Sequence, residues 1–128
     1  MKFAIQINAS PYQSAAGETA YQFAISAIAT GHKIYRIFFY YDGIYHGNHD
    51  ASPPEDEVNY TNRWRDLAKQ YSIDLVICIS AAHRRGLLCE EELQRRGEHK
   101  NSLMEGFRIS GLGQWVEAAL EADRVVIF

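Results

Sequence analysis

Hydrophobic and polar positions along the chain form short segments whose period switches between two and about four residues. Segments of strand length that are rich in β-branched and aromatic residues predict strands, whereas apolar stripes at three- and four-residue spacing predict helices. The expected strands cover residues 3–7, 34–40, 75–79, 107–109 and 124–128. The third of these is apolar on both faces, which is typical of a central strand in a parallel sheet covered by helices on both sides.

Helices are expected between these strands, over residues 17–30, 60–71, 80–85 and 89–96, and from residue 110 onwards. Ser80 and Ser110 stand where side chains cap helix starts, and Gly86 stands where a helix ends. The apolar stripe of the last helix is expected to face inward; it comprises Leu112, Trp115, Val116, Ala119 and Leu120. Residues 42–54 contain two glycines and two prolines, and this composition predicts a long loop.

The alternation of strand and helix predicts the α/β class. We expect one domain over residues 1–128, built as a three-layer α/β/α sandwich around a five-stranded parallel sheet, of the flavodoxin- or Rossmann-like kind. The order of the strands in the sheet stays open. A chain of 128 residues with 47% hydrophobic residues is large enough to bury a core of this type.

Charge and hydropathy exclude several partners. The formal net charge is -3, so no global positive field attracts nucleic acid or acidic lipid, and direct tRNA binding is not expected. No apolar run approaches the ~20 residues that span a membrane. Met1 and Lys2 lead directly into an alternating segment rather than a signal peptide, so the cytoplasm is the expected compartment.

The cysteines and histidines do not indicate a metal site. Cys78 and Cys89 form no CxxC pair, they are too few for a disulfide framework, and the five histidines are scattered. Neither a Ser-His-Asp arrangement nor paired carboxylates are visible. We therefore expect no metal and no cofactor.

Chemistry in a parallel sheet collects where strands end. After the first strand, Ser10, Ser14 and Thr19 lead into a helix and could hold a phosphate, although such hydroxyls are more often turn and cap residues. After the second strand, an aromatic loop that includes Tyr40 either shields the sheet edge or forms a wall of a partner-binding site. The pattern leaves both interpretations of this loop open.

Cys78 lies at the C-terminal end of the third expected strand and is the best candidate for chemistry. A cysteine on a buried strand is usually a small apolar filler, but this one precedes Ser80 and a helix start whose N–H groups favour an anion. Arg84 and Arg85 follow without a nearby acid, a setting that can stabilise a thiolate. Cys89 is the rival, and the glutamates at 90–92 oppose thiolate formation there.

With these residues, the chain resembles the DsrE/TusD branch of the DsrE-like sulfurtransferases over its whole length. The stretches that carry the resemblance are residues 1–7, 10–12, 20–24, 38–45, 48, 52–53, 56–57, 78–86, 110–113 and 123–128. Departures from the pattern are Cys89, where an acidic residue is usual, His46-Gly47, His83 and the loop 98–103. These departures leave the cysteine in place but bear on the choice of partner.

The resemblance implies that Cys78 accepts sulfur as a persulfide from a TusA-like donor and passes it to a TusE- or DsrC-like acceptor. It implies assembly with TusB-like and TusC-like subunits into a dimer of heterotrimers, and a route to 2-thiouridine at the tRNA wobble position. The residues expected to support the cysteine are Ser80, Arg84, Arg85, Tyr12 and Tyr40.

Two other functions remain open at this point. DsrE-like members transfer sulfur in sulfur oxidation rather than tRNA thiolation, and a flavodoxin-like phosphate or flavin binder is a distant third. Sulfur relay requires thiolate attack on a persulfide sulfur, so one reactive cysteine is sufficient and no cofactor is needed. The two cysteines and the absence of cofactor motifs are compatible with that chemistry.

Overall fold

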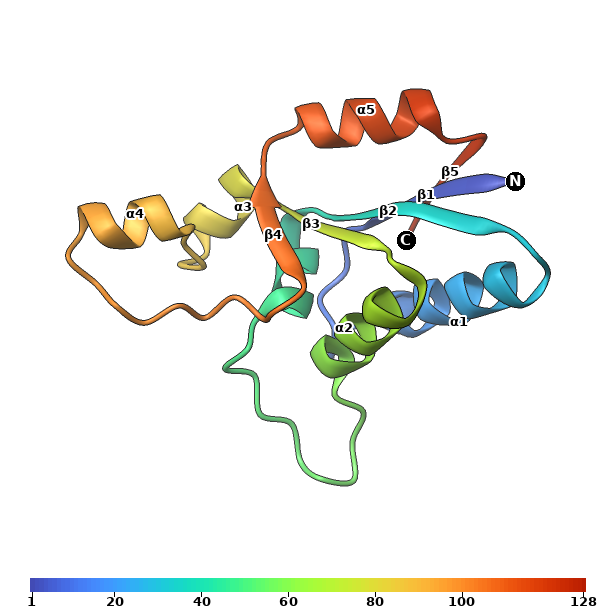
Figure 1. Ribbon diagram of the computed structural model, residues 1–128. Coiled ribbons are helices and arrows are strands. Elements are labelled where there is room, and N and C mark those ends of the chain that lie inside the picture. Colours follow the sequence, from blue (N-terminus) through green and yellow to red (C-terminus); the bar gives the residue numbers. More distant parts are fainter.

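The computed structural model describes all 128 residues and contains one five-stranded sheet in which every pairing is parallel (Figure 1). The strands are β1 (Lys2–Ile7), β2 (Lys33–Phe39), β3 (Asp74–Cys78), β4 (Phe107–Ser110) and β5 (Arg124–Ile127). Their order in the sheet is β4-β3-β2-β1-β5. The expected α/β fold with a five-stranded parallel sheet is confirmed, and the structure supplies the strand order that the sequence left open.

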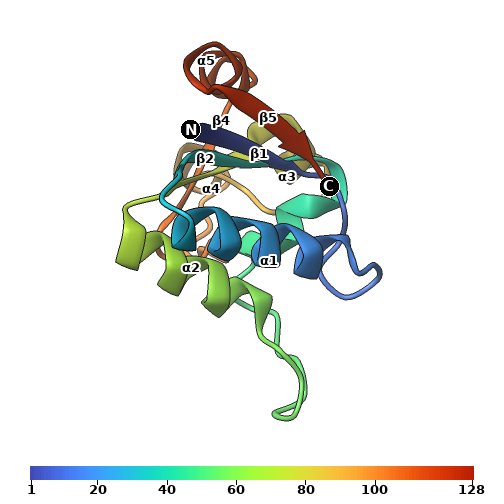
Figure 2. The same cartoon turned by 90° about the vertical axis from the view of Figure 1, so that its right-hand side faces the viewer.

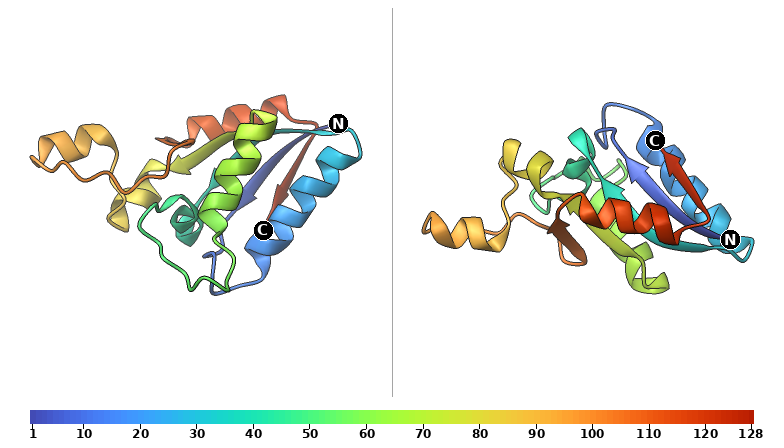
Figure 3. Two further views of the ribbon diagram at one scale, coloured as in Figure 1. Left: turned by 60° about the horizontal axis from the view of Figure 1, so that its bottom comes forward. Right: turned by 90° about the horizontal axis from the view of Figure 1, so that it is seen from above.

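Helices cover both faces of the sheet (Figure 2). The helices α1 (Ala16–Ala29) and α2 (Tyr60–Tyr71) lie side by side on one face, and α5 (Gly113–Glu121) lies alone on the other. The short helices α3 (Ile79–Arg84) and α4 (Glu90–Arg95) extend away from the carboxyl end of β3 (Figure 3). No helix combines the length and apolar character needed to cross a membrane.

The main core lies between the sheet and the α1–α2 layer. Ala20 and Ala24 of α1 are completely buried, and their small side chains allow the helix to approach the sheet closely. Trp64 of α2 is also fully buried and packs edge-on against Phe39 of β2 at a ring separation of 6.0 Å. This packing holds the ends of β1, β2 and β3 in fixed positions relative to one another.

An ion-pair network positions α5 on the opposite face. Arg36 of β2 donates to Asp74 of β3 (Nε–Oδ2 2.7 Å) and to the backbone carbonyl of Gln114 in α5 (2.8 Å). Arg108 of β4 binds the same carboxylate at 2.8 Å, and this hydrogen bond is the main reason that the pKa of Asp74 is lowered. The network joins three strands to the start of α5.

Three sequence expectations about local structure are wrong. Residues 41–47 form the 3₁₀ helix η1 (Tyr41–Gly47), because Ile44 and His46 are fully buried and draw the segment onto the core. The N-cap of α3 is Cys78 rather than Ser80, and α5 has neither Ser110 nor any other side chain as a cap. In both cases the helix starts at a different residue from the one that the hydroxyl pattern indicates.

Three of the five residues in the expected apolar stripe of α5 do not face inward, whereas Trp115 packs against the core. Leu112, Val116 and Leu120 are 53%, 50% and 80% exposed, whereas Ala118 is buried. No second helix packs beside α5 on its face of the sheet (Figure 2), so one side of the helix is left without a protein neighbour. A stripe of this kind has the same sequence pattern whether it meets a core or another subunit.

Candidate functional site

Cys78 lies at the carboxyl edge of the sheet, between the ends of two other strands. Parallel pairing places it opposite Ser110 of β4, and Ile77 opposite Phe39 of β2, so that Tyr40 continues β2 at the level of the cysteine. Because side chains alternate along strands, Tyr40, Cys78 and Ser110 share one face of the sheet, the face that carries α5. Ser110, which the sequence suggested only as a cap, is thus the cross-strand neighbour of the candidate nucleophile.

The thiol of Cys78 is enclosed in this conformation. The residue is 1% exposed, and it serves as the N-cap of α3, whose Ala81 and Ala82 are also buried. The helix starts at Ile79, directly after Cys78 and earlier than the sequence predicts, and the first-turn N–H groups of a helix favour an anion. Before any partner can reach the sulfur, the structure around it has to open.

Cys89 is the more accessible of the two free cysteines. It is half-buried at the N-cap of α4, and its backbone N–H donates to Nε2 of His83 at 3.2 Å. It lines a hollow of about 370 Å³ together with Ile79 and with two of the glutamates that follow it, Glu90 and Glu91. Accessibility therefore favours Cys89, whereas position in the sheet and local charge favour Cys78.

The predicted supporting residues fall into two groups. Ser80 and Arg84 are exposed on α3, and Tyr40 stacks on Phe38 with ring centroids 6.1 Å apart, so these residues lie on the elements that adjoin Cys78. Tyr12 lies apart from this group. Its hydroxyl donates to the carbonyl of Val58 at 3.0 Å, in the loop that leads into α2.

Arg85 has a partner that sequence proximity did not indicate. Its Nε donates to Oδ1 of Asp42 in η1 at 2.8 Å, and its Nη1 donates to the carbonyl of Ala81 at 3.1 Å. No acid is paired with Arg84. Of the two arginines expected to stabilise a thiolate, Arg85 is thus already paired with a carboxylate. The effect of either arginine on the Cys78 thiol stays a prediction.

Two contacts hold the buried side chain of His46 in one neutral tautomer. The indole N–H of Trp64 donates to Nδ1 at 3.2 Å, and Nε2 lies 3.2 Å from the carbonyl of Ala9. An indole can only donate and a carbonyl can only accept, so the proton must sit on Nε2. Burial lowers the pKa of His46 to about 4. The imidazole joins the loop after β1, η1 and α2, which is a structural role.

The hydroxyl groups that follow β1 form hydrogen bonds with nearby backbone groups. Oγ of Ser14 accepts from the backbone N–H of Ala16 at 3.1 Å, and the hydroxyl of Thr19 donates to the carbonyl of Ala15 at 3.1 Å. These are the turn and helix contacts that such residues usually make. They support the ordinary interpretation of this loop over a phosphate site.

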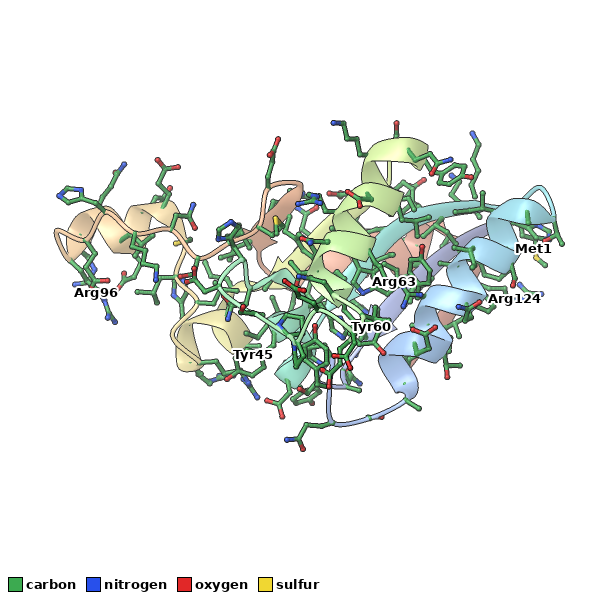
Figure 4. All side chains as sticks on the ribbon, turned by 90° about the horizontal axis from the view of Figure 1, so that it is seen from below. Met1, Tyr45, Tyr60, Arg63, Arg96 and Arg124 are labelled. Carbon is green, nitrogen blue, oxygen red and sulfur yellow. The ribbon has the colours of Figure 1, made fainter.

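Aromatic and charged side chains crowd the side of α2 that faces α1 (Figure 4). The guanidinium of Arg63 lies 3.8 Å from the ring centre of Tyr21 and binds Glu18 at 2.7 Å. Tyr60 precedes Arg63 by one helical turn, whereas Tyr45 lies on the other side of this region, towards α3 (Figure 4). The Arg63 cluster therefore ties α1 to α2 and is separate from the cysteine.

Comparison with known proteins shows to which family this chain belongs. Residues 1–128 match the model of the DsrE/DsrF-like family. The chain belongs to the DsrE/DsrF-like family. This confirms the resemblance found in the sequence.

Named relatives of this family member are sulfurtransferases. A protein of Allochromatium vinosum that carries the name sulfurtransferase DsrE is 51% identical over all of this chain and 98% of its own length. Sulfurtransferase TusD homologs of Vibrio vulnificus and Vibrio parahaemolyticus are each 41% identical over the whole chain and 98% of theirs. The protein is therefore a sulfurtransferase of the DsrE/TusD type.

A solved structure supports the fold independently. The crystal structure of the YchN protein from E. coli superposes with a TM-score of 0.75 and covers 100% of this chain and 99% of its own. At 20% sequence identity this likeness concerns the fold alone.

Proposed function

We propose that this protein is a sulfur-relay subunit that carries sulfur as a persulfide on Cys78. The observation that carries the proposal is the place of Cys78 in a chain of the sulfurtransferase family. It ends a central strand, it caps α3, and it lies at the edge where parallel sheets collect their chemistry. Cys89 has the greater accessibility but stands directly before three glutamates.

The chemistry needs two exchanges of the same kind. The Cys78 thiolate attacks the outer sulfur of a donor persulfide, a new S–S bond forms on Cys78, and the donor cysteine leaves as a thiolate. An acceptor thiolate then attacks the outer sulfur on Cys78, which leaves in turn as a thiolate. Sulfur moves at unchanged oxidation level, and no external oxidant or cofactor takes part.

The simplest test of the proposal is the mass of the protein after loading. Incubation with a persulfidated TusA-like donor is expected to add one sulfur atom, a gain of about 32 Da that a thiol reductant removes. If the mass stays unchanged although the donor transfers sulfur to another known acceptor, the proposal is wrong.

Two destinations for the sulfur are proposed, and a different observation supports each. Identity of 41% to proteins named TusD homologs supports a TusE-like acceptor and tRNA wobble thiolation. Identity of 51% to a protein named DsrE supports the alternative, a DsrC-like acceptor in sulfur oxidation. Neighbouring genes distinguish them: genes for TusB, TusC and TusE favour the first, and genes for dissimilatory sulfite reductase favour the second.

We also propose that the exposed stripe of α5 joins this chain to TusB-like and TusC-like subunits. Leu112, Val116 and Leu120 recur every four residues on the outward side of a helix, and contiguous exposed apolar surface marks interaction sites. Replacing Val116 and Leu120 together by Glu should abolish co-purification with these subunits, because two charges would be buried in the interface.

The matched control for that experiment is Gln70→Glu, which adds negative charge at an exposed position of α2 on the other face. It should leave the complex intact when size-exclusion chromatography follows co-expression. A normal complex from the Val116→Glu, Leu120→Glu variant would show that α5 is not the interface.

Direct binding of tRNA by this chain is not expected. The net charge is -3, and many of its arginines are already paired with acids, Arg36, Arg63, Arg85 and Arg108 among them. Phosphate binding depends on clustered unpaired Lys and Arg. A filter-binding assay near physiological salt should therefore detect no saturable binding at micromolar protein, and saturable, salt-sensitive binding would contradict this expectation.

A further inference from the structure

Ser110 of β4 is the residue that the sheet register places directly beside Cys78. Both side chains lie on the face of the sheet that carries α5, because side chains of paired residues in parallel strands point to the same side. Neighbouring strands lie about 4.8 Å apart, and the serine and cysteine side chains are equally short. The hydroxyl and the thiol therefore project from the sheet side by side, at the ends of two adjacent strands.

The hydroxyl of Ser110 makes no hydrogen bond within the protein. It does not cap α5, which starts at Gly113 without a side-chain cap. No buried side-chain oxygen of the protein lacks a partner, so the unpaired hydroxyl of this half-buried residue is in contact with solvent. Hydroxyls near a helix start usually bond to the backbone, as those of Ser14 and Thr19 do. Ser110 thus keeps a free donor beside the sulfur.

A sulfur anion on Cys78 is a much better partner for this donor than the resting thiol. A neutral thiol is only a weak hydrogen-bond acceptor, whereas hydrogen bonds to charged groups are about twice as strong as neutral ones. In the persulfide anion the charge lies on the outer sulfur, which an S–S bond of about 2 Å carries beyond Sγ. A serine hydroxyl rotates freely, so it can bind the charge at either sulfur.

We propose that Ser110 donates a hydrogen bond to the sulfur anion on Cys78, first to the attacking thiolate and then to the persulfide that forms. This inference rests on the proposed role of Cys78 as the sulfur carrier. Because the hydroxyl touches the reacting sulfur, Ser110 is a catalytic residue of the relay. Its hydrogen bond favours the anion over the neutral thiol and directs the outer sulfur towards the solvent side.

The charges around the two residues do not depend on the Ser110 hydroxyl. On α3, Arg84 is exposed and pairs with no acid, and Nε2 of His83 accepts from the backbone N–H of Cys89 at 3.2 Å. The other arginines on the adjoining elements are in ion pairs, namely Arg108 with Asp74, Arg36 with Asp74 and Glu117, and Arg85 with Asp42. A substitution of the serine therefore removes one hydroxyl and leaves every charge in place.

A matched pair of variants isolates the hydroxyl. Ser110→Thr keeps it, whereas Ser110→Val replaces it by a methyl group of similar size, and both β-branched residues suit a strand. In a Cys89→Ser background, alkylation of Cys78 by iodoacetamide is followed across the pH range by mass spectrometry. The pH of half-maximal rate should be about one unit higher in Ser110→Val than in Ser110→Thr, the scale of one hydrogen bond to a charged group.

Sulfur uptake from a persulfidated donor at neutral pH is the second readout. It should be about threefold slower in Ser110→Val than in Ser110→Thr. The thiolate fraction falls about tenfold, but the remaining thiolate is roughly threefold more nucleophilic because its basicity is higher. A residue that only supported the packing of β4 would affect the two variants alike and would not shift the half-maximal pH.

The control is Ser26→Ala, which removes an exposed hydroxyl from α1 on the other face of the sheet. It should match the wild type in both readouts. Equal half-maximal pH values in Ser110→Thr and Ser110→Val would overturn the inference, and so would a shift of the same size in Ser26→Ala.

The two readouts separate this inference from the proposed function. If the half-maximal pH follows the hydroxyl but neither the wild type nor any variant takes up sulfur, the proposed function fails and the hydrogen bond to the thiolate stands. If the wild type takes up sulfur and the Val and Thr variants agree in both readouts, the inference fails and the proposed function stands.

Discussion

Replacing Cys78 by Ser should abolish sulfur uptake from a persulfidated donor. A hydroxyl oxygen cannot form the S–S bond that carries the sulfur, so the mass gain of about 32 Da should disappear rather than decrease. The substitution is close in size, but it places a hydroxyl at a position that is 1% exposed. It should cost about 1–3 kcal/mol of stability if the hydroxyl finds no partner, so circular dichroism must show that the variant is folded.

Cys89→Ser is the matched control for this substitution. The residue is half-buried at the start of α4, and its thiol has no part in the proposed relay. This variant should load sulfur to the same extent as the wild type. Loading that persists in Cys78→Ser and disappears in Cys89→Ser would transfer the proposed role to Cys89.

The second large effect concerns stability at acidic pH. His46 is neutral in the folded protein with a pKa of about 4, whereas in the unfolded chain its pKa is near 6.5. Below pH 6.5 the unfolded state therefore binds a proton that the folded state does not. The stability that His46 contributes is complete above pH 6.5, falls between pH 6.5 and about 4, and changes no further below that.

The size of this loss follows from the difference in pKa. Each pKa unit corresponds to about 1.4 kcal/mol, so this single group should reduce the free energy of unfolding by about 3 kcal/mol across the window. His46→Gln keeps an amide that can both donate and accept, but it does not titrate. Urea unfolding at pH 7 and pH 4.5 should show a smaller loss in His46→Gln than in the wild type.

Carboxylates also bind protons as the pH falls, so the loss of stability in one protein does not isolate His46. The result is the difference between the loss in the wild type and the loss in His46→Gln. His99→Gln removes an exposed histidine and should keep the wild-type pH dependence. An equal loss of stability in the wild type and in His46→Gln would show that His46 does not stay neutral, and hence that the contacts with Trp64 and Ala9 do not fix its form.

The sequence predicted those parts of the fold that depend on local pattern. The apolar run over residues 75–79 has no polar face, which indicates a central strand, and β3 indeed lies between β2 and β4. Local pattern also placed Cys78 near a strand end before a helix, because the apolar run stops shortly after it and Ser80 follows. The order of the strands depends on packing between distant segments, and no local pattern reports it.

The features that the sequence did not show have a common physical origin. The stripe of Leu112, Val116 and Leu120 shows which side of α5 is apolar, but not whether the sheet or a subunit covers it. Similarly, Arg85 follows Cys78 closely in sequence, but its charge is used by Asp42, which is 43 residues away. Contacts between distant segments decide the environment of a site, and those contacts appear only in the folded structure.

The buried histidine is a further example. His46 looked like a departure from the family pattern in a glycine-containing loop, and nothing in its immediate neighbours indicated burial. The signal lay in Trp64, whose indole N–H requires an acceptor when the ring is buried. A search for buried donors that lack a local acceptor would have paired the two residues.

The central claim is that sulfur passes through Cys78, and a transfer experiment with isotope-labelled sulfur tests it most directly. The protein is loaded from a donor that carries heavy sulfur, freed from the donor, and mixed with a TusE- or DsrC-like acceptor, and peptides are followed by mass spectrometry. The account predicts that the label leaves the Cys78 peptide at the rate at which it appears on the acceptor, with none on the Cys89 peptide. Label that reaches the acceptor from Cys89, or from a Cys78→Ser variant, would contradict it.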